Sequence, residues 1–118
     1  MARFLVHVHT GPENPTKAAL GLLVAATALK AGHSVDVFLA GDGVRLLAPD
    51  GAVEGLGTGS VTAHLDAIAA GGGRLHLSGM SAKARGYDEG LLEGRPAAFA
   101  MPDVLVRLAA EADTVLCY

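Results

Sequence analysis

The stretch RFLVHVHTGPENPTKAALGLLVAATALKAG, from residue 3 to residue 32, contains the two kinds of segment from which we expect the chain to be built. Arg3–His9 is rich in apolar and β-branched residues, which favours a strand. Asn14 can cap a helix and Pro15 suits its first position, so a helix is predicted over Pro15–Ala31. Gly32 is placed to take the left-handed conformation that ends this helix. The stretch therefore predicts one βα unit.

The same alternation continues along the chain and predicts an α/β fold around a mainly parallel sheet of five strands. The four later strands are predicted at Ser34–Ala40, Arg74–Ser78, Ala97–Met101 and Thr114–Tyr118. Helical segments are predicted over Val44–Ala48, over Val61–Ala70 behind a cap by Thr58 or Ser60, from Gly79 to Arg85, and from a cap at Asp103 to Ala112. Asp50–Gly59 holds four glycines and is expected to be a loop. The length of 118 residues suits one domain spanning 1–118.

Composition narrows the possible partners and compartment. Hydrophobic residues make up 51% of the chain, and the net charge of −3 offers no basic surface for nucleic acid or anionic lipid. No uncharged apolar run approaches the ~20 residues of a membrane helix, and the first residues do not read as a signal peptide. The single cysteine, Cys117, fits a reducing compartment. We therefore expect a cytoplasmic protein with no nucleic-acid or membrane partner.

The first helix predicts self-association. Ala18–Leu29 has no charged residue on any face, and Thr27 is its only hydroxyl. A helix on a sheet normally keeps one polar side toward water. A second copy of the chain would cover the outer side here, which predicts a homo-oligomer. The alternative is that small alanines make the outer side only weakly apolar.

The loop after the third predicted strand is the most distinctive candidate site. Ligands bind at the carboxyl ends of strands in such sheets, and the sequence LSGMSAKARGY places two hydroxyls, a glycine and two cations there. This pattern favours a small anion. The candidate residues are Ser78, Gly79, Met80, Ser81, Lys83 and Arg85, together with Thr10 and Asp42 on the neighbouring strand-end loops. One alternative is that Ser78 or Ser81 simply caps the helix while Lys83 and Arg85 are solvated. Another is that Arg85 ties the loop to a carboxylate such as Asp88 or Glu89.

Five blocks of the sequence resemble, in order, those of the DsrE/DsrF-like family, which has the YchN-like fold. They are HTGPENPTKA at 9–18, AGHSVDVFLAGDGV at 31–44, SGMSAKARG at 78–86, LLEG at 91–94 and MPDVL at 101–105. The resemblance implies a three-layer α/β/α sandwich around a mostly parallel five-stranded sheet. It also implies assembly into a homotrimer or homohexamer.

The resemblance also separates three hypotheses about function. Sulfur-relay members carry a cysteine on the loop that corresponds to Ser78–Ser81, and a serine hydroxyl cannot replace a thiolate in that chemistry. The first hypothesis is therefore a non-catalytic protein that binds an anion or a partner at this loop, with no cofactor. The second is persulfide handling by Cys117, although its apolar neighbours in the last strand predict a buried thiol. The third is a structural or regulatory subunit.

Other motifs are weaker. His7 and His9 share one face of the first strand, but zinc needs further ligands that the spacing does not supply, so we expect strand histidines with satisfied hydrogen bonds rather than a metal site. Gly55–Gly59 is not a dinucleotide-binding motif, because no strand precedes it and Ser60 stands at the last glycine position. A serine nucleophile at Ser78 or Ser81 has no base that the sequence can place beside it.

Overall fold

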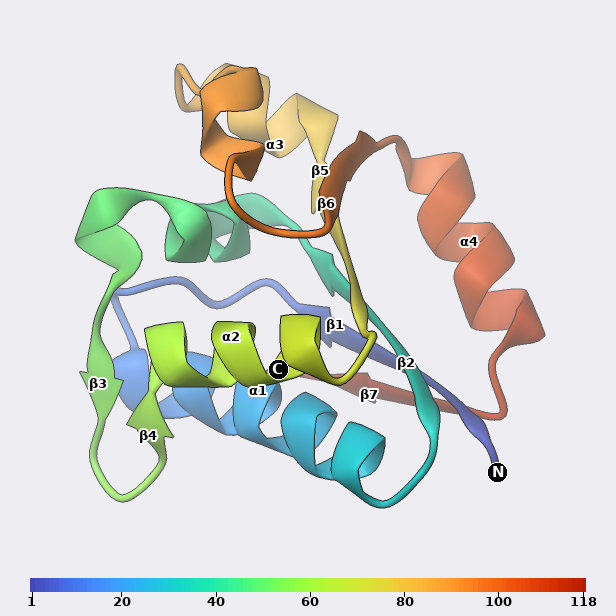
Figure 1. Ribbon diagram of the computed structural model, residues 1–118. Helices are drawn as coiled ribbons and strands as arrows, with labels where there is room; N and C mark the ends of the chain where they lie inside the picture. The colour runs from blue at the N-terminus through green and yellow to red at the C-terminus, as the bar shows by residue number, and fades with distance from the viewer.

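Five parallel strands form the central sheet of the computed structural model, which describes residues 1–118 (Figure 1). Their order across the sheet is β6-β5-β2-β1-β7, and every neighbouring pair is parallel. The chain starts near the middle, builds outward to β6, and crosses back to the opposite edge for β7. The strands are β1 (Arg3–Val8), β2 (Ser34–Leu39), β5 (Arg74–Ser78), β6 (Ala97–Ala100) and β7 (Thr114–Cys117). The predicted α/β class and the five-stranded parallel sheet are confirmed.

Helices cover both faces of this sheet (Figure 1). α1 (Pro15–Lys30) and α2 (Val61–Ala70) lie side by side on one face, whereas α4 (Pro102–Glu111) lies on the other. α3 (Gly79–Ala84) directly follows β5. Short 3₁₀ helices complete the chain: η1 (Gly41–Leu47), η2 (Pro49–Gly51) and η3 (Glu89–Leu92). None of the helices combines the length and apolar character needed to cross a bilayer.

The helix ends follow the local chemistry that the sequence indicates, with one exception. Oδ1 of Asn14 accepts the N–H of Lys17 and caps α1, and Oγ of Ser60 accepts the N–H of Ala63 and caps α2. Gly32 has φ +93° after α1, as predicted. The predicted cap at Asp103 is wrong: α4 already starts at Pro102, whose ring suits the first helical turn, so Asp103 lies inside the helix.

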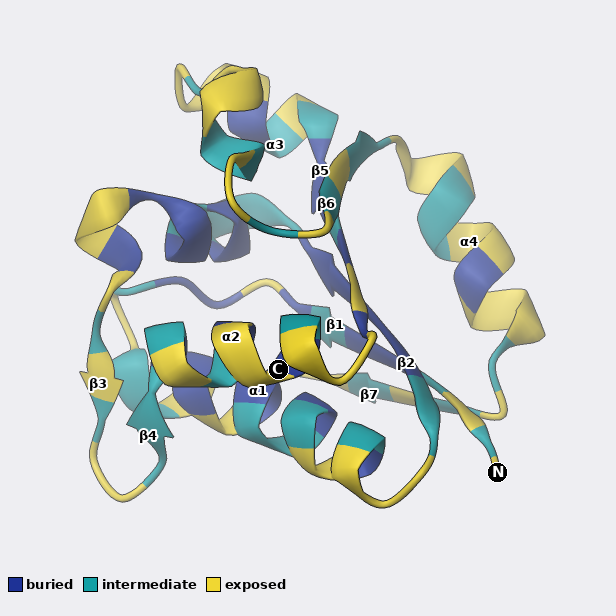
Figure 2. Cartoon of the chain, in the orientation of Figure 1, coloured by how far each residue is buried: buried dark blue, intermediate teal, exposed yellow.

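The hydrophobic core is strongly asymmetric (Figure 2). On the α1/α2 face, 18 buried residues form one cluster that includes Val6 and Leu22. On the α4 face, the buried cluster consists of Leu5, Phe38 and Leu108. The α4 face therefore leaves more of its strand side chains within reach of solvent.

A small hairpin is the main element that the sequence analysis missed. β3 (Glu54–Gly55) and β4 (Gly59–Ser60) pair antiparallel within the stretch expected to be a loop. Glycines let the chain turn tightly here, because Gly57 and Gly59 have φ of +75° and +84°. With only two residues in each strand, no alternation of apolar and polar residues marks the hairpin in the sequence.

Candidate functional site

The carboxyl ends of the strands bring three loops together. A Cβ atom on Gly11, after β1, would overlap the carbonyl oxygen of Asp42, after β2, so these loops approach as closely as a glycine allows. The N–H of Gly41 donates to Oγ of Ser81 in α3, at 2.9 Å. Because ligands of open α/β sheets bind at this edge, the three loops form the candidate site.

Both serines of the candidate site hold the loop in shape. Oγ of Ser78 accepts the N–H of Ser81 at 3.1 Å and caps α3, while Oγ of Ser81 accepts the N–H of Gly41. Each hydroxyl therefore has one acceptor position in use, and its O–H hydrogen remains able to donate. The capping role that the sequence analysis weighed as an alternative is present for Ser78.

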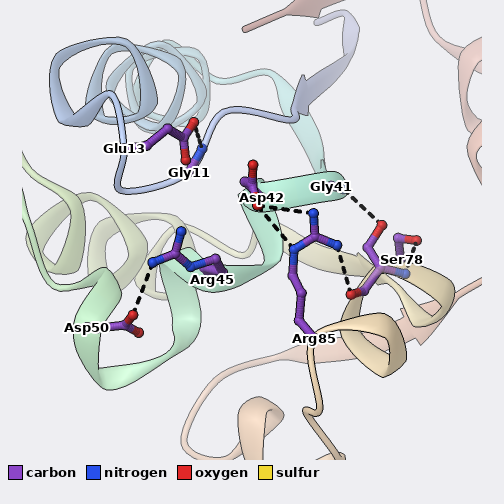
Figure 3. A network of polar contacts seen from close by, with 9 residues as sticks. Gly11, Glu13, Gly41, Asp42, Arg45, Asp50, Ser78 and Arg85 are labelled. Atoms are coloured by element: carbon purple, nitrogen blue, oxygen red, sulfur yellow. Dashed lines mark hydrogen bonds and ion pairs between the residues drawn. The ribbon is translucent and has the colours of Figure 1, made fainter.

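Arg85 points back to the loop after β2 (Figure 3). Its Nε and Nη2 donate to the same carboxylate oxygen, Oδ1 of Asp42, at 3.1 and 3.0 Å, and its Nη1 donates to the carbonyl of Ser81 at 3.1 Å. The partner is therefore Asp42 rather than Asp88 or Glu89. The pair lies at the surface, since the side chains of Arg85 and Asp42 are 31% and 47% exposed.

Lys83 does not join Arg85. Lys83 lies in the last turn of α3 and Arg85 is its C-cap residue, and positions two apart along a helical turn do not face each other. Lys83 and Met80 are exposed. Gly79, between β5 and Met80, lies beside the side chain of Met101, which is also exposed. The two cations of the sequence motif thus face different parts of the surface.

The arginines of the strand-end loops each form an ion pair with a carboxylate. Arg45 pairs with Asp50 at 3.2 Å, and this hydrogen bond raises the pKa of the Arg45 guanidinium (Figure 3). Glu13 folds back so that Oε2 accepts the N–H of Gly11. Thr10 is buried in the first of the three loops. Each arginine drawn in Figure 3 therefore already has a carboxylate partner.

A second polar group lies on the α4 face of the sheet. Asp36 accepts from Nε of Arg74 at 3.1 Å, and its Oδ1 lies 2.8 Å from Nε2 of His76, which stacks on the ring of Phe38. Burial alone would raise the pKa of Asp36, but the hydrogen bonds from His76 and Arg74 outweigh it and hold that pKa below its usual value. This group was not predicted from the sequence. The signal was available, because a charged residue inside the apolar strand SVDVFL requires a partner.

His7 and Cys117 are neighbours on this face. They are register partners on β1 and β7, and the His9 ring lies 5.4 Å from the His7 ring. Burial, and then the neighbouring His9, lower the pKa of His7. Nε2 of His7 is buried without a hydrogen-bond partner, so the expectation that the strand histidines are satisfied is wrong for this atom.

The prediction that Cys117 is buried is also wrong. Cys117 is exposed, and Val115, on the same side of β7, is 44% exposed. The reason is position: β7 is an edge strand, and α4 covers only part of this face. Apolar neighbours in the sequence do not show whether a strand lies at an edge.

Side chains suited to metal binding do not gather anywhere in the protein. No group of three or more His, Cys, Asp and Glu residues lies close enough to hold an ion. His7 and His9 are close, but they are joined by no third ligand of this kind.

Comparisons with known proteins agree on the fold. The family model described as the DsrE/DsrF-like family matches residues 2–118. The crystal structure of the YchN protein from E. coli is similar over 100% of both chains, with a TM-score of 0.79 and 17% identity. A conserved protein of unknown function from Bacteroides thetaiotaomicron is similar over 99% of this chain and 95% of its own, with a TM-score of 0.73 and 12% identity. No curated protein matches the sequence.

Proposed function

This chain belongs to the DsrE/DsrF-like family, and on that premise we propose that it is a homo-oligomeric, non-catalytic protein that binds a small anionic ligand at Arg85. One observation carries the proposal. The Arg85 guanidinium stands at the surface of the strand-end loops with its two donors to Asp42 directed at a single carboxylate oxygen. Arg85 is therefore available to a ligand whose oxygens match the geometry of the guanidinium better than the single oxygen of Asp42 does.

The energetics favour exchange of Asp42 for such a ligand. A guanidinium has five N–H donors, and Arg85 uses three of them. Surface ion pairs contribute only about 0–1 kcal/mol, so moving Asp42 aside costs little. An oxyanion with two oxygens in one plane would accept two parallel hydrogen bonds from Arg85, which is the stronger arrangement. Ser78 and Ser81 supply further O–H donors on the same loop.

The non-catalytic part rests on side-chain chemistry. By the family resemblance, the loop after β5 corresponds to the stretch in which sulfur-relay members carry a cysteine, and here it has Ser78, Gly79, Met80 and Ser81. The hydroxyl oxygen of a serine at this position cannot form or release a persulfide. The role that fits is binding without a covalent step.

Self-association is the second part of the proposal. The uncharged outer side of α1 favours contact with another copy of the chain over contact with water. A homotrimer or homohexamer is what the family resemblance implies. Sedimentation velocity of the wild type measures the assembly directly.

A second candidate function is thiol chemistry at Cys117. Its exposure on β7 and its register partner His7 favour a thiol that reagents can reach. A persulfide formed on Cys117 by a sulfur donor, detected by mass spectrometry, would make this candidate the better one.

Calorimetric titration with sulfate, sulfite and phosphate tests the anion site. Arg85→Ala should weaken binding about tenfold or more, because charge-assisted hydrogen bonds contribute about 1.5–3 kcal/mol. Asp42→Asn should tighten binding, since it removes the competing carboxylate. Arg107→Ala, which removes the same charge from α4, should leave binding unchanged. If no anion binds the wild type at millimolar concentration, the anion site is wrong, and a structural or regulatory role of the loop is favoured.

A further inference from the structure

Two histidines flank one buried aromatic ring on the α4 face. His7 of β1 and His76 of β5 are both register partners of Phe38 on β2, and their ring centroids lie 5.9 and 6.2 Å from that of Phe38. Phe38 is 2% exposed and belongs to the cluster that α4 covers through Leu108. The two imidazoles therefore lie in the same layer of the protein, on opposite sides of one ring.

Only one of these histidines has a partner for a positive charge. Nε2 of His76 lies 2.8 Å from Oδ1 of Asp36, so a proton gained by His76 meets a carboxylate. Nε2 of His7 is buried and makes no hydrogen bond. A neutral imidazole donates from one ring nitrogen, whereas a protonated imidazole donates from both. Protonation of His7 therefore creates a buried N–H that has no acceptor.

The neighbouring strands offer His7 no counter-charge. His9 lies on the same face of β1 with its ring 5.4 Å away, and a charge on His9 would repel a charge on His7. The register partner on β7 is Cys117, which is not a carboxylate. Asp36 is the only acidic residue of β2, and its Oδ1 is engaged by His76. No carboxylate of these strands is thus free to accept from His7.

α4 turns its charged side chains toward solvent. Asp103, Arg107 and Glu111 recur every four residues along the helix, and all three are exposed. Arg107 pairs with Glu111 at 3.6 Å, and Glu111 also lies 4.0 Å from Arg3. The residues of α4 and its C-cap that pack on the sheet are apolar, namely Val104, Leu105, Leu108 and Ala112. The buried side of α4 therefore supplies no counter-charge either.

We propose that α4 is a pH-sensitive cover: protonation of His7 favours an open state in which α4 has moved off the sheet and Nε2 of His7 reaches water. α4 is the helix that lies on this face, and the buried cluster beneath it consists of Leu5, Phe38 and Leu108 (Figure 1). Opening exposes Leu5 and Phe38, and it leaves the larger core under α1 and α2 in place. The cover does not depend on a ligand at Arg85.

The pH range follows from the direction of the pKa shift. Burial first, and His9 second, hold the pKa of His7 below its ordinary value of 6.5 in the closed protein. In the open state His7 is hydrated and returns toward that ordinary value. Below pH 6.5 the open state therefore binds more protons, so the closed state loses stability as the pH falls toward the lowered pKa and changes no further below it. The range lies above the ordinary pKa of 3.8 of Asp36, whose own pKa is lowered.

Amide hydrogen exchange between pH 7.5 and 5 tests the cover. The protection of α4 amides, divided by that of α1 amides in the same sample, should fall below pH 6.5 by at most about tenfold per pH unit. His7→Phe keeps a ring beside Phe38 but cannot gain a proton, so its ratio should stay constant. His9→Gln is the matched control on the same face. It should keep most of the fall, because burial is the larger cause of the shift.

An NMR titration of the wild-type imidazole signals supplies a measurement that needs no variant. The His7 ring should gain its proton below pH 6.5, over the range in which α4 loses protection. A constant α4 ratio in the wild type would overturn the proposal, as would an equal fall in folded His7→Phe. If His7→Phe does not fold, the NMR titration decides: a fall in α4 protection while the His7 ring stays neutral also makes the proposal wrong.

Discussion

One face of the sheet lies under α1 and α2, whereas the other lies under α4 alone. On the first face the side chains are apolar and close-packed, in a cluster of 18 buried residues. The second face has a buried cluster of 3, beside which lie the ion pair of Asp36 with Arg74, the rings of His7 and His76, and the exposed Cys117. The difference indicates that the α1/α2 face carries the stability of the fold, while the α4 face can hold polar and reactive groups at little cost to it.

Truncating one leucine on each face should give the largest contrast. Leu22→Ala should lower the free energy of unfolding by about 2–5 kcal/mol, because it empties a fully buried site that neighbours on all sides hold open. Leu108→Ala should cost about 2 kcal/mol or less, since α4 can settle onto the smaller cluster. Urea unfolding followed by circular dichroism measures both. Equal losses would show that the two faces contribute alike and would remove the contrast.

Removing the charge of Asp36 under α4 should lower the free energy of unfolding by an intermediate amount. Asp36→Asn removes the charge that accepts from Arg74 and His76, which should cost about 1.5–3 kcal/mol at neutral pH. Because the pKa of Asp36 is lower in the folded protein, its stabilisation is present above the ordinary value of 3.8 and is lost as the pH falls below it. The gap between variant and wild type should therefore shrink under acid.

The control for this prediction is Asp66→Asn, which removes an exposed carboxylate that pairs with the half-buried Arg95. It should change stability by at most ~1 kcal/mol. A gap between Asp36→Asn and wild type that stays constant from neutral pH into acid would contradict the lowered pKa of Asp36.

The same contrast explains which features the sequence could predict. The strands and helices of the βα units were predictable because their apolar runs and capping residues, such as Asn14 and Ser60, act within a few positions. The contacts of the candidate site and of the polar group on the α4 face join distant positions: Arg85 reaches Asp42, and Asp36 reaches His76. Local patterns carry no information on which of several carboxylates a cation will meet. For the same reason, the motif suggested a pair of cations that α3 then separates.

The smallest expected effect is the difference between the rates at which a thiol reagent modifies Cys117 in the native and in the unfolded protein. Cys117 is exposed on an edge strand of the thinly covered face, so a thiol reagent should modify it in the native protein about as fast as in urea. Burial would give a very different result, because a thiol reached only through an opening of about 4 kcal/mol reacts roughly 1,000-fold more slowly than a free one. The matched control places a cysteine on the other face: Val6→Cys in a Cys117→Ser background.

Val6 is fully buried on the central strand β1, so a cysteine there should be strongly protected in the native state. Labelling followed by mass spectrometry gives both rates on the same time axis. Strong protection of Cys117 in dilute monomer would contradict its exposed position. Protection that appears only at concentrations where the protein self-associates would instead show that a second copy covers the α4 face, and not the outward side of α1 alone. The concentration dependence of this one rate therefore tests whether the open face stays open in the assembled protein.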